Sequence, residues 1–250
     1  MRILRRILVG LGIAIGLLVF WIEWAGPVST TFWAIRHAPP VTYVTPAELS
    51  DRTVSQAKGT SFTESGYQFD LPWTDIDASP NPPARRNLPG KLIKFRSGLQ
   101  VWFSTFPKGA LANELASSFH SSPELVRSGF DLGRMNSDYE VHKELYEFTP
   151  AGMHRWSVDP RLHYRECMTL VIKSVTLPDR ASLGIFRIHN EQFQGFQLGT
   201  PQTLSSGVSA ELFSAAGGVQ FYIHQRDVHN SASLTQADIN RIVQSLRRVQ

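Results

Sequence analysis

The longest hydrophobic stretch of the chain lies near its start and is bounded by charged residues. Ile7 to Ile22 contains no charged side chain, three arginines precede it, and Glu23 follows it. A helix over residues 4–24 would be about 30 Å long, which is the thickness of the hydrocarbon core of a bilayer. This pattern predicts a single transmembrane anchor. Because positive charge stays inside, we expect a cytoplasmic N-terminus and an extracytoplasmic main domain at the cell membrane.

Two other interpretations of this stretch stay open. A basic start followed by an apolar run is also typical of a cleaved signal peptide, although the next residues, EWAGPVST, offer no small-x-small cleavage site. A helix buried in a soluble core is the third interpretation, and it leaves the flanking charge unexplained. Trp21, Trp24 and Trp33 favour the anchor, because tryptophan is enriched where a span meets the lipid headgroups.

Residues 26–65 differ from the anchor because they show no sustained hydrophobic period. They contain four prolines and scattered serines and threonines, a composition typical of a linker. We therefore expect an extracytoplasmic tether here, with the folded part beginning at Gly66. The chain would then consist of a cytoplasmic stub and anchor at 1–25, the tether at 26–65, and one domain at 66–250.

Alternation of apolar and polar residues predicts strands in the first and last parts of this domain. The run GYQFDLPW places Tyr67, Phe69 and Leu71 on one face. The run KLIKFRSGLQVWFSTF predicts two strands joined by a turn at Ser97-Gly98. Later in the chain, GIFRIHNEQFQGFQLG, VSAELFS and GVQFYIHQ alternate or run apolar, which predicts further strands.

The middle of the domain follows the helical period instead, and we interpret it as an insertion at about 110–177. Helices are predicted at Ala110–Phe119, after Ser122, after a Ser137 capping box, and after Asp159. In the last of these helices one apolar stripe is expected to face the core, formed by Tyr164, Cys167, Met168, Val171 and Val175.

The chain closes with an amphipathic pattern that predicts a helix from Leu234 to Val249, capped by Ser233 or Thr235. Strands, helices, strands and a final helix in this order favour an α+β fold, in which helices cover an antiparallel sheet. The predicted molecule is therefore an α+β domain preceded by one N-terminal transmembrane helix.

From Gly66 onward this order resembles the PsbP-type fold. The resemblance is carried by the opening GYQFDLPW strand, the central antiparallel sheet, and a terminal strand and helix, GVQFYIHQ and LTQADINRIVQSLRRV. Proteins of that fold mostly act as binding or assembly factors, so the resemblance implies a binding role. It supplies no active-site residues.

Composition and charge exclude several classes of protein. A single cysteine excludes a disulfide scaffold, a zinc site built on cysteines and a CxxC redox pair. The formal net charge of +4 falls to +2 over residues 67–250, where nineteen basic residues stand against seventeen acidic ones. Nucleic-acid binding needs basic charge clustered on one face, and no such cluster occurs. We therefore expect no nucleic-acid partner.

The one cysteine lies in a pattern that could support nucleophilic catalysis. His163 comes four residues before Cys167, and Glu166 comes one residue before it, so imidazole and thiol would share a helical face. An imidazole that activated the thiol would make Cys167 a nucleophile. Free cysteines more often act as small apolar side chains, and Cys167 belongs to the stripe that we expect to be buried.

Two other runs partly resemble metal-binding patterns. His224, Asp227 and His229 supply three potential ligands, the number used by a catalytic zinc site, but their spacing is also typical of a turn. The run DIDASPN, which starts at Asp75, begins like a calcium loop. Its later positions do not fit, because the glycine and the final glutamate of such a loop are replaced by proline and arginine. We assign no metal and no cofactor.

We therefore expect a non-enzymatic protein that contacts the lipid bilayer through residues 4–24 and whose extracytoplasmic domain binds an unidentified protein or envelope partner. One alternative is a carrier or sensor of an apolar ligand, with a pocket lined by residues such as Trp102, Phe186 and Phe221. The other alternative is an enzyme that uses the Cys167 pair or the histidine-rich run. No catalytic residue is assigned.

Overall fold

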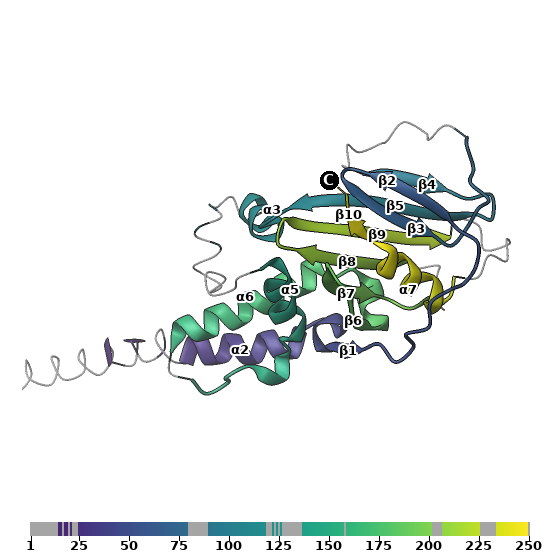
Figure 1. The fold of residues 1–250 in the computed structure, drawn as a ribbon. Helices are drawn as coiled ribbons and strands as arrows, with labels where there is room; N and C mark the ends of the chain where they lie inside the picture. The colour runs from purple at the N-terminus through teal and green to yellow at the C-terminus, as the bar shows by residue number, and fades with distance from the viewer. Residues whose placement is uncertain are drawn as a thin grey trace, which may run out of the picture.

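A seven-stranded sheet forms the centre of the molecule (Figure 1). The computed structural model describes residues 15–16, 18–19, 21, 25–79, 90–118, 122, 124, 126, 137–157, 159–201, 207–225 and 234–249. In spatial order the strands are β1 (Pro46–Glu48), β6 (Ile185–His189), β7 (Gln194–Leu198), β8 (Val208–Ser214), β9 (Gly217–Gln225), β5 (Leu99–Pro107) and β4 (Lys91–Lys94). Neighbouring strands are antiparallel, except that β1 runs parallel to β6.

A smaller sheet and a set of helices cover the two faces of the larger sheet. The smaller sheet has the order β10 (Arg247–Arg248), β3 (Tyr67–Leu71) and β2 (Thr60–Glu64). The α-helices are α2 (Gly26–His37), α3 (Ala110–Ser118), α5 (Asp138–Glu147), α6 (Pro160–Thr176) and α7 (Gln236–Ser245). Three short 3-10 helices are η2 (Pro40–Tyr43), η4 (Pro150–Gly152) and η5 (Asp179–Leu183). This arrangement confirms the predicted α+β class.

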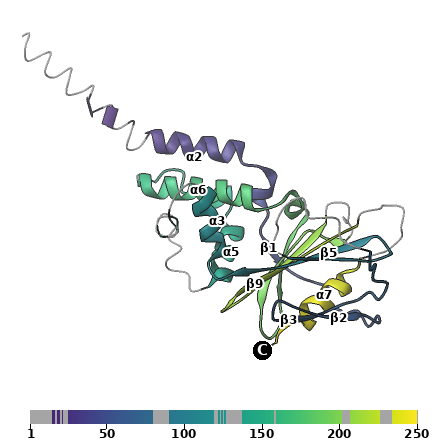
Figure 2. The same cartoon turned by 90° about the horizontal axis from the view of Figure 1, so that it is seen from above.

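The order of the layers is clearest from above (Figure 2). Helix α2 lies on the outside and packs against α6, and α6 in turn lies over α3 and α5. The larger sheet follows, and α7 with the smaller sheet covers its other face. Each face of the larger sheet therefore has its own hydrophobic core.

Aromatic side chains fill the core between the two sheets. Phe103 and Phe221 are directly opposed on β5 and β9, and their ring centroids are 5.2 Å apart. Phe69 of β3 lies 4.7 Å from the first ring and 5.0 Å from the second. The alternation of apolar residues in β3 is what directs Phe69 inward, so the predicted strand and its buried face are confirmed.

Local signals in the sequence place several element ends correctly. Gly98 takes a positive φ of 86° in the turn between β4 and β5, as expected for the Ser97-Gly98 pair. The side chains of Ser137, Asp159 and Thr235 accept hydrogen bonds from the first turns of α5, α6 and α7. These contacts confirm the predicted helix starts, because a short polar side chain satisfies amides that the helix leaves free.

The predicted closing helix is too long. Helix α7 ends at Ser245, and Arg247 and Arg248 form β10, which pairs with β3. The apolar Leu246 fits the helical stripe, but it is buried at the point where the chain leaves the helix for the sheet edge.

The segment predicted as a tether at 26–65 is folded onto the domain. Val28 and Thr31 of α2 are buried against the rest of the molecule, and Val41 belongs to a hydrophobic core. The segment also supplies β1 and β2 to the two sheets. The strands of this segment are short, and the buried residues of α2 are Val28 and Thr31, so no sustained hydrophobic period results. Prolines stand at the starts of α2 and η2, where proline is compatible with helix formation.

Three of the five residues in the α6 stripe that was expected to face the core are instead on the outside, whereas Cys167 and Met168 are half-buried. Tyr164, Val171 and Val175 are 62%, 46% and 69% exposed. The buried face carries His163, Glu166, Leu170, Ile172 and Lys173, of which three are polar or charged. These polar side chains are buried because each has hydrogen-bond partners, in the loop before α6 for Glu166 and also in the first fifty residues for His163 and Lys173, a compensation that burial of polar groups requires.

The predicted anchor at 4–24 lies mostly outside the described residues. Among the residues that the structure does describe, no helix combines the length and the apolar character needed to cross a membrane. The helix predicted after Ser122 also lies mostly outside the described residues.

Candidate functional site

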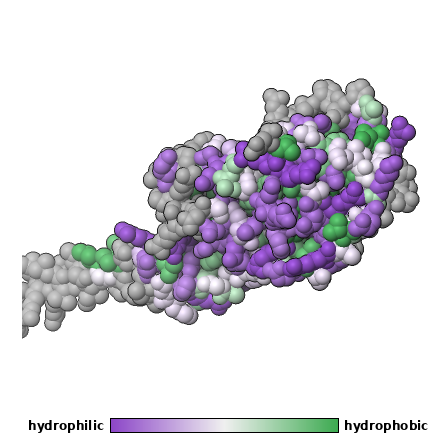
Figure 3. All heavy atoms as spheres, viewed as in Figure 1, coloured by the Kyte–Doolittle hydropathy of each residue, from purple (hydrophilic) through white to green (hydrophobic). Residues whose placement is uncertain are grey.

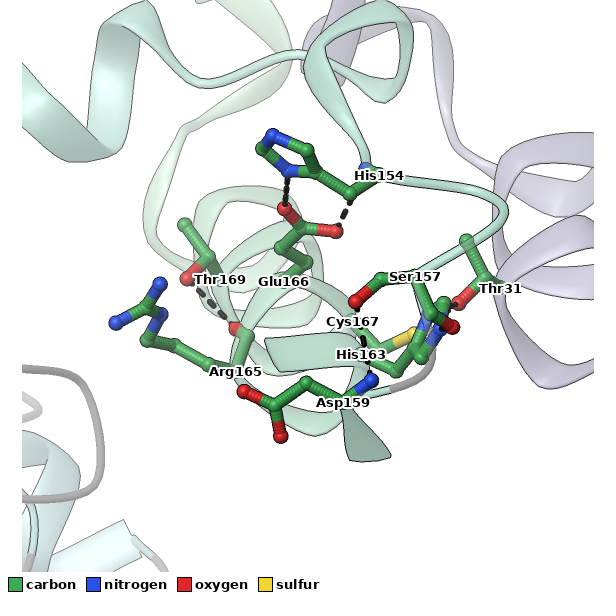
Figure 4. Close-up of polar contacts among 9 residues, drawn as sticks. All are labelled: Thr31, His154, Ser157, Asp159, His163, Arg165, Glu166, Cys167 and Thr169. Atoms are coloured by element: carbon green, nitrogen blue, oxygen red, sulfur yellow. Dashed lines mark hydrogen bonds and ion pairs between the residues drawn. The ribbon is translucent and has the colours of Figure 1, made fainter. Parts of the chain in front are cut away.

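The residues of the predicted cysteine–histidine pair meet where α2 packs on α6 (Figure 4). The Nδ1 atom of His163 lies 2.6 Å from Oγ1 of Thr31, and its Nε2 atom lies 2.7 Å from the carbonyl oxygen of Ser157. The Sγ atom of Cys167 lies 4.0 Å from the same Thr31 hydroxyl. Thr31 and His163 are both buried, so the contact is enclosed between the helices.

The hydrogen bonds of His163 occupy both nitrogens of its ring. A carbonyl oxygen can only accept, so Nε2 carries a proton and donates it to Ser157. Nδ1 lies 2.6 Å from the Thr31 hydroxyl, which also donates to the carbonyl oxygen of Pro27 at 3.1 Å. Both ring nitrogens are used inside the fold, and neither remains to take a proton from Cys167.

The environment of Cys167 also disfavours a thiolate. Burial raises the pKa of the thiol, the contact with Thr31 partly offsets this effect, and the negative charge of Glu166 adds to it. A reactive cysteine needs the opposite surroundings, with positive charge nearby and a lowered pKa. The sequence correctly placed Cys167 and His163 on one face of a helix, but the arrangement suits packing between helices better than nucleophilic attack.

Glu166 turns away from this pair toward the loop before α6 (Figure 4). Its carboxylate accepts two hydrogen bonds from His154, one from Nδ1 at 2.6 Å and one from the backbone N at 2.9 Å. The side chain of Glu166 is buried whereas the imidazole of His154 is largely exposed. The two bonds hold the loop that follows η4 against α6.

The other predicted ligands do not form a described site. His224 lies on β9, where its ring stacks on Tyr222 at 5.1 Å, whereas Asp227 and His229 lie outside the described residues. Within the described ranges, no three His, Cys, Asp or Glu side chains are close enough together to hold a metal ion.

The two described aspartates of the DIDASPN run shape their own loop. Asp75 accepts a hydrogen bond from N of Ser97 at 2.8 Å, which ties the loop to the β4–β5 turn. Asp77 accepts from the hydroxyl and the amide of Ser79, and these bonds lower the pKa of Asp77. Asp77 therefore acts as a local turn acceptor, whereas Asp75 joins two loops.

The residues suggested for an apolar pocket do not share one cavity. Phe221 is fully buried in the aromatic core, on the face of the sheet covered by α7. Trp102 pairs with Tyr222 and points to the opposite face, because neighbouring residues of a strand alternate. Phe186 is half-buried on β6, at the other side of the sheet order.

Sequence reasoning missed the buried lysine of α6. Lys173 is fully enclosed, and its Nζ atom donates to the carbonyl oxygens of Val44, Tyr146 and Phe148 at 2.8, 2.7 and 2.7 Å. Burial lowers the pKa of Lys173 to about 8. A charge inside the apolar run LVIKSVTL was the available signal, because such a residue needs partners when its neighbours are buried.

The exposed stripe of α6, formed by Tyr164, Val171 and Val175, borders a cleft. Val171 and Val175 line a space of about 640 Å³ together with residues of α3, α5 and β8. Elsewhere the described surface is mostly polar on the face drawn in Figure 3, where hydrophobic atoms form small separate patches. Apart from Val54 and Leu183, the large apolar side chains found exposed among the described residues lie before β1 or between Trp156 and Val175.

No protein family, no curated protein and no solved structure matches this chain. The resemblance to PsbP-type domains stays a prediction.

Proposed function

We propose that this chain is a non-enzymatic, single-pass membrane protein whose extracytoplasmic α+β domain binds or assembles with a protein partner. Residues 4–24 would form the anchor. The exposed apolar stripe of α6 carries the proposal. Three large apolar side chains, Tyr164, Val171 and Val175, are accessible on one helix whose opposite face is buried.

An exposed apolar helix face beside a cleft is the kind of surface that protein partners use. A surface helix normally turns its apolar stripe toward the core, whereas α6 buries a mixed face of polar and apolar residues and leaves Tyr164, Val171 and Val175 outside. Contiguous apolar surface on a soluble domain commonly marks an interaction site. The neighbouring cleft between α3 and α6 would accept side chains of the partner.

Site-specific photo-crosslinking in native membranes tests the partner proposal. A photoreactive amino acid at Val171 should give a discrete crosslinked species, and the same group at Thr63, which is exposed on β2, should not. Val175→Asp should abolish the product at Val171 without unfolding the domain, because Val175 is 69% exposed. Equal labelling at Val171 and Thr63 would refute the partner surface.

The anchor and its orientation need a separate experiment. We expect the chain to remain in the membrane pellet after alkaline carbonate extraction. In a Cys167→Ala background, Thr63→Cys should react with a membrane-impermeant maleimide on intact spheroplasts. Thr63 is the better probe, because the native thiol is half-buried and its pKa is raised. Labelling only after permeabilisation would place the domain in the cytoplasm.

A carrier of an apolar ligand is the second candidate function. The cleft beside α6 has a volume of about 640 Å³, within the usual range for small-ligand sites. It lies between α3, α5 and α6 rather than around Trp102 and Phe221. Saturable binding of a fluorescent fatty-acid analogue, lost in Val171→Asp, would favour this function over the partner surface. The cysteine enzyme is not proposed, because both nitrogens of His163 already have partners.

A further inference from the structure

We propose that the cleft beside α6 receives a basic side chain, an arginine or a lysine, from the protein partner. The inference rests on the proposed function, because the same partner would cover Val171 and Val175, which line this cleft. It adds the chemistry that the partner must present there, which is a cation carried on an apolar stem.

Much of the cleft surface is apolar. The cleft lies where α3, α5 and α6 meet strands β5, β8 and β9 (Figure 1), and its volume is about 640 Å³. Its lining includes Leu111 and Leu115 of α3 together with Val171 and Val175 of α6. Arginine and lysine have methylene stems that pack along such a surface while their charged ends reach polar groups.

The formally charged residues of the lining are all acidic. They are Glu114 of α3, Asp138 of α5 and Glu211 of β8, and no lysine or arginine lines the cleft in the part of the chain that the structure describes. Asp138 is already engaged, because its two carboxylate oxygens accept from N of Gly109 at 2.9 and 3.0 Å. Glu114 is exposed and Glu211 is half-buried. Charge of one sign in a cleft attracts a cation and opposes an anion such as a fatty acid.

Glu211 is the centre of the proposed contact, because neutral donors hold its carboxylate. Its Oε2 atom accepts from the hydroxyl of Tyr146 at 2.9 Å, and its Oε1 atom accepts from Nε2 of Gln220 at 3.1 Å. The ion pairs formed between described residues do not include Glu211. Arg180 acts on Glu211 only at longer range, and its guanidinium lies 4.5 Å over the ring of Tyr222. A carboxylate has about four acceptor sites, so Glu211 can accept from a further donor.

The other hydrogen-bonding groups of the cleft also favour a ligand that donates. The hydroxyl proton of Tyr146 is directed to Glu211. Nδ1 of His142 donates to the carbonyl oxygen of Asp138 at 2.8 Å, so Nε2 is an acceptor in the neutral ring. Arginine and lysine side chains carry donors only. Phe213 also lines the cleft, and an aromatic face attracts a cation.

A protein partner accounts for more of this surface than a small amine does. The exposed stripe of α6 continues to Tyr164, which is 62% exposed and lies outside the cleft lining. A small ligand in the cleft would leave Tyr164 in water. A partner that inserts one basic side chain would cover the cleft and the stripe together, as a central contact surrounded by apolar surface.

Binding of an amphipathic cation to the solubilised full chain tests the charge preference of the cleft. The probe is dansylcadaverine, a primary amine on an alkyl stem, and N-pentyl dansylamide is its uncharged counterpart. Their fluorescence would be corrected with protein-free micelles. We expect Glu211→Gln to weaken dansylcadaverine binding about tenfold, because the amine loses a charged acceptor. Glu64→Gln, on β2 of the smaller sheet, should leave this affinity unchanged.

Two further measurements complete the test. Glu114→Gln should weaken dansylcadaverine binding by about two- to threefold, since an exposed charge contributes less. Binding of the uncharged probe should be the same in the wild type and in all three variants. In native membranes, Glu211→Gln should reduce the crosslinked product at Val171 several-fold, and Glu64→Gln should not.

The outcomes separate this inference from the proposed function. Equal affinity of dansylcadaverine for the wild type and the Glu211→Gln variant would overturn the inference. If circular dichroism showed that Glu211→Gln does not fold, equal affinity for the wild type and Glu114→Gln would overturn it instead. A product at Val171 that Glu211→Gln leaves undiminished would overturn the inference and keep the partner surface. Probe binding that depends on Glu211, with no product at Val171 in the wild type, would refute the protein partner and assign the cleft to a small organic cation.

Discussion

At the scale of single residues, Lys173 joins parts of the chain that are distant in sequence. Its ammonium has three N–H groups, and each meets a carbonyl oxygen, one after η2 and two around the end of α5. Removing a cation from water is costly unless its donors are satisfied, so the three bonds are a condition for burial. The same bonds satisfy carbonyls at segment ends, where no helix or sheet partner is available.

We expect Lys173→Met to lower the free energy of unfolding by about 3 kcal/mol, because three buried carbonyls lose a charged donor. The measurement is urea denaturation of the solubilised chain. Lys91→Met is the matched control, since Lys91 forms an exposed pair with Glu64 at 2.7 Å and should contribute less than about 1 kcal/mol. An equal free energy of unfolding for the Lys173→Met variant and the wild type would show that the three hydrogen bonds of Lys173 do not stabilise the fold.

The pKa of Lys173 predicts a specific pH dependence. The folded-state pKa is lowered from 10.5 to about 8, so between these values the unfolded chain holds a proton that the folded chain has released. Stability from this group therefore rises with pH across that window, by at most about 1.4 kcal/mol per pH unit. Subtracting the Lys173→Met curve from the wild-type curve isolates the effect. A difference that stays flat between pH 8 and pH 10.5 would contradict the lowered pKa.

At the scale of elements, α6 shows what the sequence could and could not predict. Its start at Asp159 and its end near Thr176 were predicted, because caps and prolines act on adjacent residues. The predicted orientation of α6 was wrong, because the helical period of its apolar residues favoured burial of the face that carries Tyr164. The burial of the polar residue His163 depends on its hydrogen bond with Thr31, which is 132 residues away. A local sequence pattern cannot predict such a partner.

The α2–α6 contact should therefore be sensitive to one hydroxyl group. We predict that Thr31→Val, which keeps the side-chain shape, lowers the free energy of unfolding by about 1–2 kcal/mol, because Nδ1 of His163 loses its buried hydrogen-bond partner. Ser29→Ala on the exposed face of α2 is the control and should change stability by less than about 0.5 kcal/mol. Similar denaturation midpoints for the two variants would show that the hydroxyl does not stabilise the helix pair.

At the scale of the whole molecule, the domain includes the segment that its composition suggested was a linker. Residues 26–65 supply the outermost helix, an edge strand on each sheet, and the carbonyl of Val44 that Lys173 requires. Short elements that bury only a few side chains each give no periodic signal, so composition alone could not reveal their packing. The boundary of the folded unit therefore lies close to the predicted anchor.

This boundary can be tested by comparing two fragments. The fragment 26–250 keeps every contact of α2 and should unfold in one cooperative transition. The fragment 66–250 lacks the strand that pairs with β6 and the residue that covers His163, so we expect its thermal midpoint to fall by on the order of 10 °C, or the fragment to aggregate. Circular dichroism during heating measures both. Equal midpoints would mean that residues 26–65 add nothing to the stability of the domain and act as a tether after all. The lower midpoint expected here would show instead that the domain folds as one unit with residues 26–65, including helix α2.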